Sequence, residues 1–243
     1  MSQPHRMYCT AHALVTLCAI CLALLLAPAV AHGQEVGKRL HALSVGVRGG
    51  VGAGGITIRP YQPTHSALLY DIGLRAALHS SKNLAMVLEF NFRRTGYTSS
   101  YPTPHSSTPP SPEASLYAAQ QDWLTLPLLM EGRVHIGPVS INVFAGPEGD
   151  LLLTERAGKA GVLTKQPLHS SLHQRLGMSI LGGIGVGLNT RIGSFVVEYR
   201  TFYRLTSLYA GAQLPKLDMP RSNMRGQEAS LSYYYTFTFG NQP

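Results

Sequence analysis

The chain has 243 residues, of which 44% are hydrophobic and only 13% are charged, and its formal net charge is +8 at pH 7. Soluble domains carry about 25% charged residues, so this composition argues against an ordinary soluble globular domain. The Lys and Arg residues are scattered and accompany no nucleic-acid motif, so we expect no nucleic-acid partner and instead look to the phosphates of anionic lipid or lipopolysaccharide.

The N-terminal segment, residues 1–33, is typical of a cleaved signal peptide. Its apolar stretch, Ala13 to Ala27, is followed by Ala29-Val30-Ala31, which has the small-x-small form of a cleavage site. This apolar stretch is too short to cross a bilayer of about 30 Å as a helix. We predict cleavage after Ala31 or after Gly33 and a mature domain over residues 34–243.

The mature sequence alternates between apolar and polar residues in stretches of about ten residues, which predicts amphipathic β-strands. In the clearest stretch, residues 84–95, Leu88 and Phe90 lie on an apolar face, whereas Glu89 and Arg93 lie on the opposite face. In chain order the predicted strands cover about residues 40–52, 68–78, 84–95, 123–134, 139–151, 174–188, 195–205 and 228–240.

The connections between these strands alternate between long and short. Outer-membrane barrels have this arrangement, with short periplasmic turns and long outer loops. The short connections lie near residues 79–83, 136–138 and 189–194, and the long ones near residues 53–66, 96–120, 152–173 and 206–225.

The polar faces of the predicted strands carry Arg together with Asp and Glu, a combination that suits a crowded interior of bidentate ion pairs. In lipid, strands satisfy all their backbone groups only as a closed barrel, and eight strands leave an interior that side chains fill. We therefore predict an all-β, closed antiparallel up-and-down transmembrane β-barrel of about eight strands, without an open pore. The predicted lumen ion-pair network comprises Asp71, Arg75, Glu89, Arg93, Glu131, Arg133, Glu148, Asp150, Arg175, Glu198, Arg200 and Arg204.

Aromatic residues lie near the ends of several predicted strands. Such residues form girdles at the two membrane interfaces of outer-membrane barrels. The alternative for each residue is the general preference of aromatic side chains for strands. The expected girdle residues are Tyr70, Phe92, Tyr97, Trp123, Phe195, Tyr203, Tyr233 and Phe239.

Short motifs resemble a known family, the PorT-like outer-membrane β-barrel proteins of the Bacteroidetes type. The run 122–131 resembles their aromatic-x-x-(Ile/Leu)-Pro-Leu-Leu strand, and the run 143–147 resembles their next strand, which ends in Ala-Gly-Pro. The Gly-rich run 183–188 and the Glu-Tyr-Arg run 198–200 look like two later strands, although the family order is Glu-x-Arg-Tyr-like. The residues that carry the first two motifs are Trp123, Leu126, Pro127, Leu128, Leu129, Gly146 and Pro147.

This resemblance spans about residues 40–240 and implies an integral outer-membrane barrel. The namesake of the family is associated with protein secretion across that membrane. The family supplies no catalytic residues, so the resemblance assigns none to this chain.

The sequence predicts no catalytic, cofactor or metal site. Residues 50–55 match G-x-G-x-x-G, but a β-like segment follows them where a dinucleotide site needs a helix. The three Cys residues lie within the signal peptide, and the mature His residues lack the spacing of a helical zinc site. Ser170 and Ser171 lie near His169 and His173, but closeness within one polar loop is weak evidence for a catalytic triad.

Our leading hypothesis is a non-enzymatic protein of the outer membrane of a Gram-negative-type bacterium, with a structural or partner-binding role through its long outer loops. The alternatives are a narrow channel or a component of transport or secretion, and a membrane-embedded lipid hydrolase. A soluble lipocalin-like barrel is a further alternative, which the charges on the inward faces contradict. The expected partners are membrane lipid, lipopolysaccharide, the outer-membrane assembly machinery and a secretion-system or envelope protein.

Overall fold

The structure is a computed structural model that describes residues 41–59, 64–100, 116–159, 162–166, 174–208 and 221–239. The predicted signal peptide and its boundary at residue 34 lie outside these ranges, as does the Ser and His group of residues 169–173. Within the described ranges there is no helix of the length and apolarity needed to cross a membrane.

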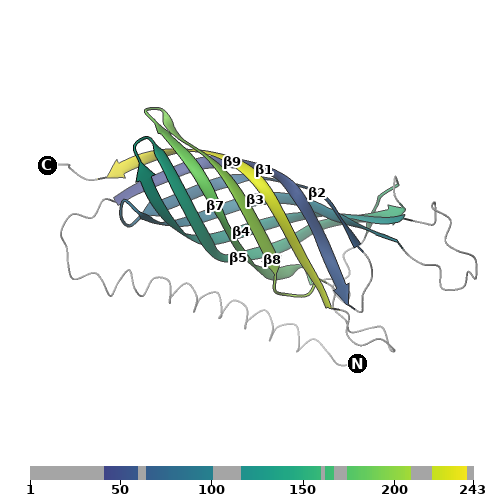
Figure 1. The fold of residues 1–243 in the computed structure, drawn as a ribbon. Helices are drawn as coiled ribbons and strands as arrows, with labels where there is room; N and C mark the ends of the chain where they lie inside the picture. The colour runs from purple at the N-terminus through teal and green to yellow at the C-terminus, as the bar shows by residue number, and fades with distance from the viewer. Residues whose placement is uncertain are drawn as a thin grey trace, which may run out of the picture. The chain divides into compact units, whose positions relative to one another are not determined.

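The described residues form nine strands in one antiparallel sheet (Figure 1). Each of the eight alternating stretches is a long strand, and β6 (Thr164–Gln166) is a short addition that pairs with β5. The long strands are β1 (His41–Arg59), β2 (Thr64–His79), β3 (Leu84–Ser100), β4 (Leu116–Ile136), β5 (Val139–Lys159), β7 (Leu176–Thr190), β8 (Gly193–Arg204) and β9 (Arg221–Phe239).

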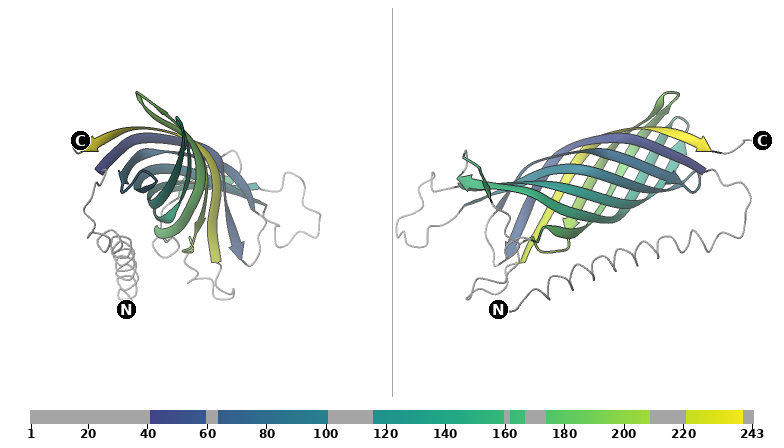
Figure 2. Two further views of the ribbon diagram at one scale, coloured as in Figure 1. Left: turned by 60° about the vertical axis from the view of Figure 1, so that its left-hand side comes forward. Right: turned by 180° about the vertical axis from the view of Figure 1, so that it is seen from behind.

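The sheet closes on itself. Each long strand pairs with the next long strand along the chain, and β1 pairs with β9 to complete the ring (Figures 1 and 2). The β1–β9 pairing runs from His41↔Phe239 at one end to Arg59↔Arg221 at the other. The predicted closed up-and-down β-barrel is therefore confirmed.

One end of the barrel is formed by the three short turns, β2–β3, β4–β5 and β7–β8, and we call it the short-turn end. The β4–β5 turn depends on Gly137, whose φ of 61° is in the left-handed region that side chains disfavour. His41 pairs with Phe239, so the two ends of the described chain also lie here. In outer-membrane barrels the short turns face the periplasm, which assigns this end to the periplasm.

The outer surface of the barrel is apolar around its whole circumference. A soluble monomer rarely exposes an apolar patch larger than a few hundred Å², so this continuous belt needs lipid around it. With the charged residues on the inside, the protein is an integral outer-membrane β-barrel. Every long strand contributes large exposed side chains, among them Val47, Leu74, Phe90, Leu126, Val143, Ile184, Val197 and Leu231.

Several strands are much longer than a membrane requires. A tilted strand crosses a bilayer in about 9–11 residues, whereas β4 and β5 each have 21. The excess lies at the end opposite the short turns. We call this part the outer extension: residues 55–59, 94–100, 116–122, 153–159, 164–166 and 221–226.

The interior beneath the outer extension contains a group of apolar side chains, together with buried polar residues such as Gln121 and Glu155. Its side chains include Ile56, Leu69, Leu152 and Met224, all of which are buried. The expectation that Tyr97 and Trp123 belong to an interfacial girdle is wrong. Both point into the barrel and are buried in this apolar group, because each lies on the inward side of its strand. The described side chains of the other expected girdle residues, Tyr70, Phe92, Phe195, Tyr203 and Tyr233, lie on the outer face.

Leu74→Arg would place a charge in the middle of the apolar belt. We expect it to lower the free energy of unfolding in phospholipid vesicles by about 2–4 kcal/mol, because the guanidinium must enter hydrocarbon. Val162→Arg is the matched control, since Val162 is similarly exposed (69% against 60%) but lies between β5 and β6, outside the belt. Its cost should be about 1 kcal/mol or less. Equal losses in a denaturant titration would contradict the placement of the belt.

Candidate functional site

The polar faces of the strands meet inside the barrel, where they form the candidate site. Successive residues of a strand point to opposite faces, so the alternation that exposes Leu88 and Phe90 to lipid directs Glu89 and Asn91 inward. Four arginines, Arg48, Arg93, Arg200 and Arg204, are among the largest fully buried side chains of the protein. Buried charges are stable only when they are paired, and the lumen supplies the partners.

Two arginines organise the centre of the lumen. Arg75 donates to Glu198, with Nη1 and Oε1 2.5 Å apart, and also to Glu131. Arg200 holds both carboxylate oxygens of Glu89, at 2.7 and 2.8 Å, and donates from Nη2 to Glu198 at 2.7 Å. Each arginine therefore bridges two carboxylates that come from different strands.

A second pair of arginines continues the arrangement toward the outer extension. Arg48 of β1 bridges Asp71 of β2 and Glu228 of β9. Arg93 of β3 forms a bidentate pair with Glu148 of β5, at 2.6 and 2.9 Å, and its Nε lies 3.3 Å from Asp71. Asp71 thus links the two arginines across the lumen.

Aromatic rings pack against the arginines that the carboxylates hold. The guanidinium carbon of Arg93 lies 4.2 Å from the ring centre of Phe202, and that of Arg200 lies 4.9 Å from the ring centre of Phe144. A cation over an aromatic face is attracted to it, and the ring also fills space beside the planar guanidinium. The lumen is therefore filled by ion pairs and rings together.

The ion pairs form one continuous chain, which we call the lumen network. At the short-turn end it begins with Arg133, whose Nη2 lies 2.6 Å from Glu131. Apart from Arg133, every member has a side chain that is at most 2% exposed. A chain of paired, buried side chains therefore extends across the bore. The lumen network consists of Arg133, Glu131, Arg75, Glu198, Arg200, Glu89, Arg48, Glu228, Asp71, Arg93 and Glu148.

Most of the predicted lumen residues belong to this network. Asp150 is also buried in the lumen, where it accepts a hydrogen bond from the Ser179 hydroxyl. Arg204 is buried over the ring of Trp123, 4.5 Å from its centre, and donates to Thr206. The predicted residues within the network are Asp71, Arg75, Glu89, Arg93, Glu131, Arg133, Glu148, Glu198 and Arg200.

The structure does not bring Arg175 into the lumen network. Arg175 is exposed and lies just before β7, and its Nε donates to the backbone oxygen of Leu152 at 3.4 Å. Alternate residues of β7 point into the lumen, but β7 begins at Leu176, so this alternation does not include Arg175.

Two network residues, Arg48 and Glu228, are absent from the predicted set. Both lie on the polar faces of their strands. Arg48 shares its face of β1 with Ser44, and Glu228 shares its face of β9 with Ser230. The alternation in the sequence was therefore a sufficient signal for both. Without Arg48, Asp71 and Glu89 would each lose one of their cationic partners.

The residues of the family-like motif occupy different environments. Leu126 is on the lipid-facing surface, whereas Pro127 and Leu129 are buried in the lumen. Gly146 marks a close approach of β5 to β4: a Cβ atom there would lie 2.0 Å from the backbone oxygen of Leu128. In the same motif Leu128 and Pro147 are half-buried.

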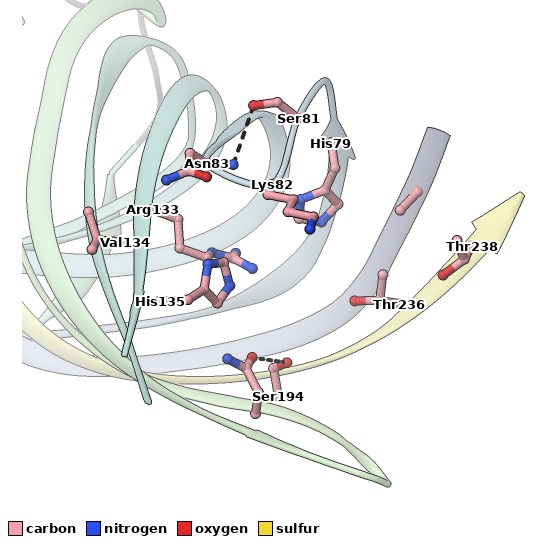
Figure 3. A pocket seen from close by; sticks show the side chains of 12 residues that line it. His79, Ser81, Lys82, Asn83, Arg133, Val134, His135, Ser194, Thr236 and Thr238 are labelled. Atoms are coloured by element: carbon pink, nitrogen blue, oxygen red, sulfur yellow. Dashed lines mark hydrogen bonds between the residues drawn. The ribbon is translucent and has the colours of Figure 1, made fainter. Parts of the chain in front are cut away.

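The lumen opens into a cavity at the short-turn end, which we call the vestibule (Figure 3). It has a volume of about 500 Å³. The Nε2 atom of His79, a lining residue, lies 2.7 Å from the Oγ atom of Ser44. The Oγ atom of Ser44 also lies 2.7 Å from the Oγ1 atom of Thr236. The lining residues are Ala42, His79, Ser81, Lys82, Asn83, Arg133, Val134, His135, Asn189, Ser194, Thr236 and Thr238.

The Ser44–His79 pair lacks two features of a catalytic dyad or triad. Ser44 is only 1% exposed, so its hydroxyl is screened from a substrate. In addition, no carboxylate of the described residues is bonded to His79, whereas a triad uses one to orient its histidine. The described residues also contain no group of three or more His, Cys, Asp or Glu that could hold a metal ion.

Comparisons with known proteins found similar solved structures. No family model and no curated protein matches the chain. The chain is similar to outer membrane protein OprG of Pseudomonas aeruginosa (8% identity, 82% of this chain and 98% of that chain covered, TM-score 0.48). It is also similar to the attachment invasion locus protein Ail of Yersinia pestis (12% identity, 79% of this chain and 98% of that chain covered, TM-score 0.39). A third similar structure is the outer membrane enzyme PagL (11% identity, 75% of this chain and 97% of that chain covered, TM-score 0.36).

Glu89→Gln should destabilise the barrel strongly, because it leaves Arg200, Arg75 and Arg48 without a shared carboxylate. Breaking a buried ion pair costs about 3–5 kcal/mol. Asp122→Asn is the control, since its partner Arg94 has a side chain 23% exposed, and such a pair contributes about 1 kcal/mol or less. The measurement is denaturant unfolding in lipid vesicles. A loss for Glu89→Gln no larger than that of the control would show that the lumen network does not stabilise the fold.

Proposed function

We propose that this protein is a non-conducting, non-enzymatic barrel that supports a rigid binding platform above the outer membrane. The observation that carries the proposal is the lumen network, whose buried side chains bridge the strands and leave no open bore. A barrel of eight strands has room inside for side chains but not for a wide channel in addition. The function is therefore expected on the surfaces rather than in a pore.

The outer extension supplies the platform. Its strands continue the hydrogen-bonded ladder of the barrel, as in the β4–β5 pairs from Tyr117↔Lys159 to Asp122↔Thr154. Apolar side chains such as Ile56, Tyr97 and Met224 pack inside it, as part of the buried apolar cluster of the barrel. Sites on such elements are held more firmly than sites on loops.

The charges of this platform favour an anionic partner. The described basic residues Arg156, Lys165, Arg175 and Arg225 are at its surface or on the adjoining turn. The two described acidic residues of the outer extension, Asp122 and Glu155, are buried. Lipopolysaccharide phosphates surround an outer-membrane protein at this level, and we propose them as the first ligand.

Membership of the PorT-like family is also part of the proposal. It is supported by the sequence motif from Trp123 to Leu129 and by the Ala-Gly-Pro end of residues 145–147. Within that family, a role beside secretion or envelope proteins would use the same platform. Among the described residues, the Ser44–His79 geometry favours the non-enzymatic role over a lipid hydrolase.

Planar-bilayer recordings test whether the lumen network blocks conduction. We expect the wild-type protein to give no discrete conductance steps. The double variant Arg75→Ala/Arg200→Ala should give small steps that favour cations, because it empties space at the centre and leaves Glu89, Glu131 and Glu198 without these partners. A gel shift between unboiled and boiled samples verifies that each protein is folded. Stable steps from the folded wild-type protein would refute this blocking role and support a channel.

The platform is tested by adding lipopolysaccharide to the folded protein in detergent and following thermal unfolding. A ligand that binds the native state raises the unfolding temperature. We expect Arg225→Gln to reduce this increase, whereas the control Arg191→Gln, with the same charge change at the short-turn end but outside the vestibule, should retain it. Equal behaviour of the two variants would contradict binding at the outer extension.

A further inference from the structure

The vestibule has the dimensions of a small-molecule site. Its volume of about 500 Å³ falls within the range of about 300–1,000 Å³ that is typical of ligand pockets. Its walls come from β1, β2, β4, β7, β8, β9 and the β2–β3 turn, so the barrel itself fixes their positions. Its inner boundary is the start of the lumen network at Arg133, which closes the path through the barrel.

Four basic or potentially basic side chains line this cavity: His79, Lys82, Arg133 and His135 (Figure 3). None of the lining residues is Asp or Glu. Side chains of one sign that converge on a concave surface focus their field into it and raise the local concentration of the opposite ion. The vestibule is therefore electrostatically suited to an anion.

The neighbouring carboxylate, Glu131, pairs with Arg133 but is not among the lining residues of the vestibule. It is fully buried and is shared between Arg75 and Arg133. Arg133 uses Nε and Nη2 for Glu131 and Tyr234, and within the described residues its Nη1 has no hydrogen-bond partner. Within the described part of the chain, the side chains of Lys82 and His135 likewise form no hydrogen bond or ion pair. Donors therefore remain for a ligand.

Apart from the apolar Ala42 and Val134, the rest of the lining is polar and neutral. Ser81, Asn83, Asn189, Ser194 and Thr236 surround the cationic group with hydroxyl and amide groups. Hydroxyl and amide N–H groups donate to carboxylate and phosphate oxygens, and a charged acceptor shortens and strengthens such bonds. A purely apolar ligand would leave these groups without partners.

We propose that the vestibule is a binding site for a small anion that carries a carboxylate or phosphate group and enters from the periplasm. Arg133 anchors the anion with a charge-assisted hydrogen bond, Lys82 adds long-range attraction from the rim, and the rings of His79 and His135 supply further polar groups. The lumen network behind Arg133 retains the anion at the periplasmic end, so this is a binding site and not an entrance to a channel. The site is independent of the proposed platform at the opposite end.

The test is calorimetric titration of the folded full barrel in detergent, at low ionic strength, with inorganic phosphate and separately with succinate. We expect at least one probe to bind, and the probe that binds identifies the anionic group. Arg133→Gln should weaken binding about tenfold or more, because it removes a hydrogen bond between charged groups. Lys82→Gln, which leaves the lumen network intact, should weaken it about threefold, as expected for one partly screened charge.

The matched control is Arg191→Gln, which removes one positive charge from the exposed β7–β8 turn, outside the lining of the vestibule, and should leave binding unchanged. Absence of heat with both probes, or equal binding by the wild-type protein and Lys82→Gln, would overturn the proposal. If Arg133→Gln fails to fold, as judged by its gel shift on boiling, Lys82→Gln and His135→Gln decide the outcome. Loss of binding in the control variant would show a general charge effect and would also overturn the proposal.

Discussion

The structure depends on one constraint: in hydrocarbon, every backbone N–H and C=O group of a strand must be paired within the protein. The pairing of β1 with β9 meets this constraint by closing the sheet. Closure with eight long strands then fixes the width of the interior, which side chains must fill. Because the outer face is committed to lipid, the charged residues in the membrane-spanning part of the strands are confined to this narrow space. The lumen network follows from closure.

The charged lumen also explains how the strands keep their register. A slip of one residue would move every inward side chain to the outside. In this barrel such a slip would expose residues such as Arg93 and Glu198 to lipid, at a cost of several kcal/mol for each charge. An apolar lumen would impose a much smaller penalty, since both faces would then tolerate lipid. Buried ion pairs are a weak source of stability by comparison with apolar packing, so we infer that their main contribution is specificity.

The sequence predicts the fold better than the site. Alternation identifies the eight long strands, and it directs Glu89 and Arg200 inward, but it does not reveal that they meet, 111 residues apart. The predicted strands are too short at the end opposite the short turns. For example, β5 continues to Lys159, whereas its predicted end is near residue 151. The lipid-facing pattern stops there because the strands leave the membrane. Trp123 was misplaced because its position near a strand end suggested an interfacial girdle, whereas alternation places it on the inward face together with Thr125 and Pro127.

The two ends of the lumen therefore have opposite character. Toward the outer extension, apolar side chains such as Leu69 and Trp123 exclude water from the bore. Toward the periplasm, the lumen network ends at Arg133, which meets the polar vestibule. A solute that crossed the barrel would have to separate several buried ion pairs in succession, each at about 3–5 kcal/mol, and then enter the apolar group. An anion that stops at Arg133 avoids both costs. This asymmetry is why we assign binding to the vestibule and the outer extension, and not to passage between them.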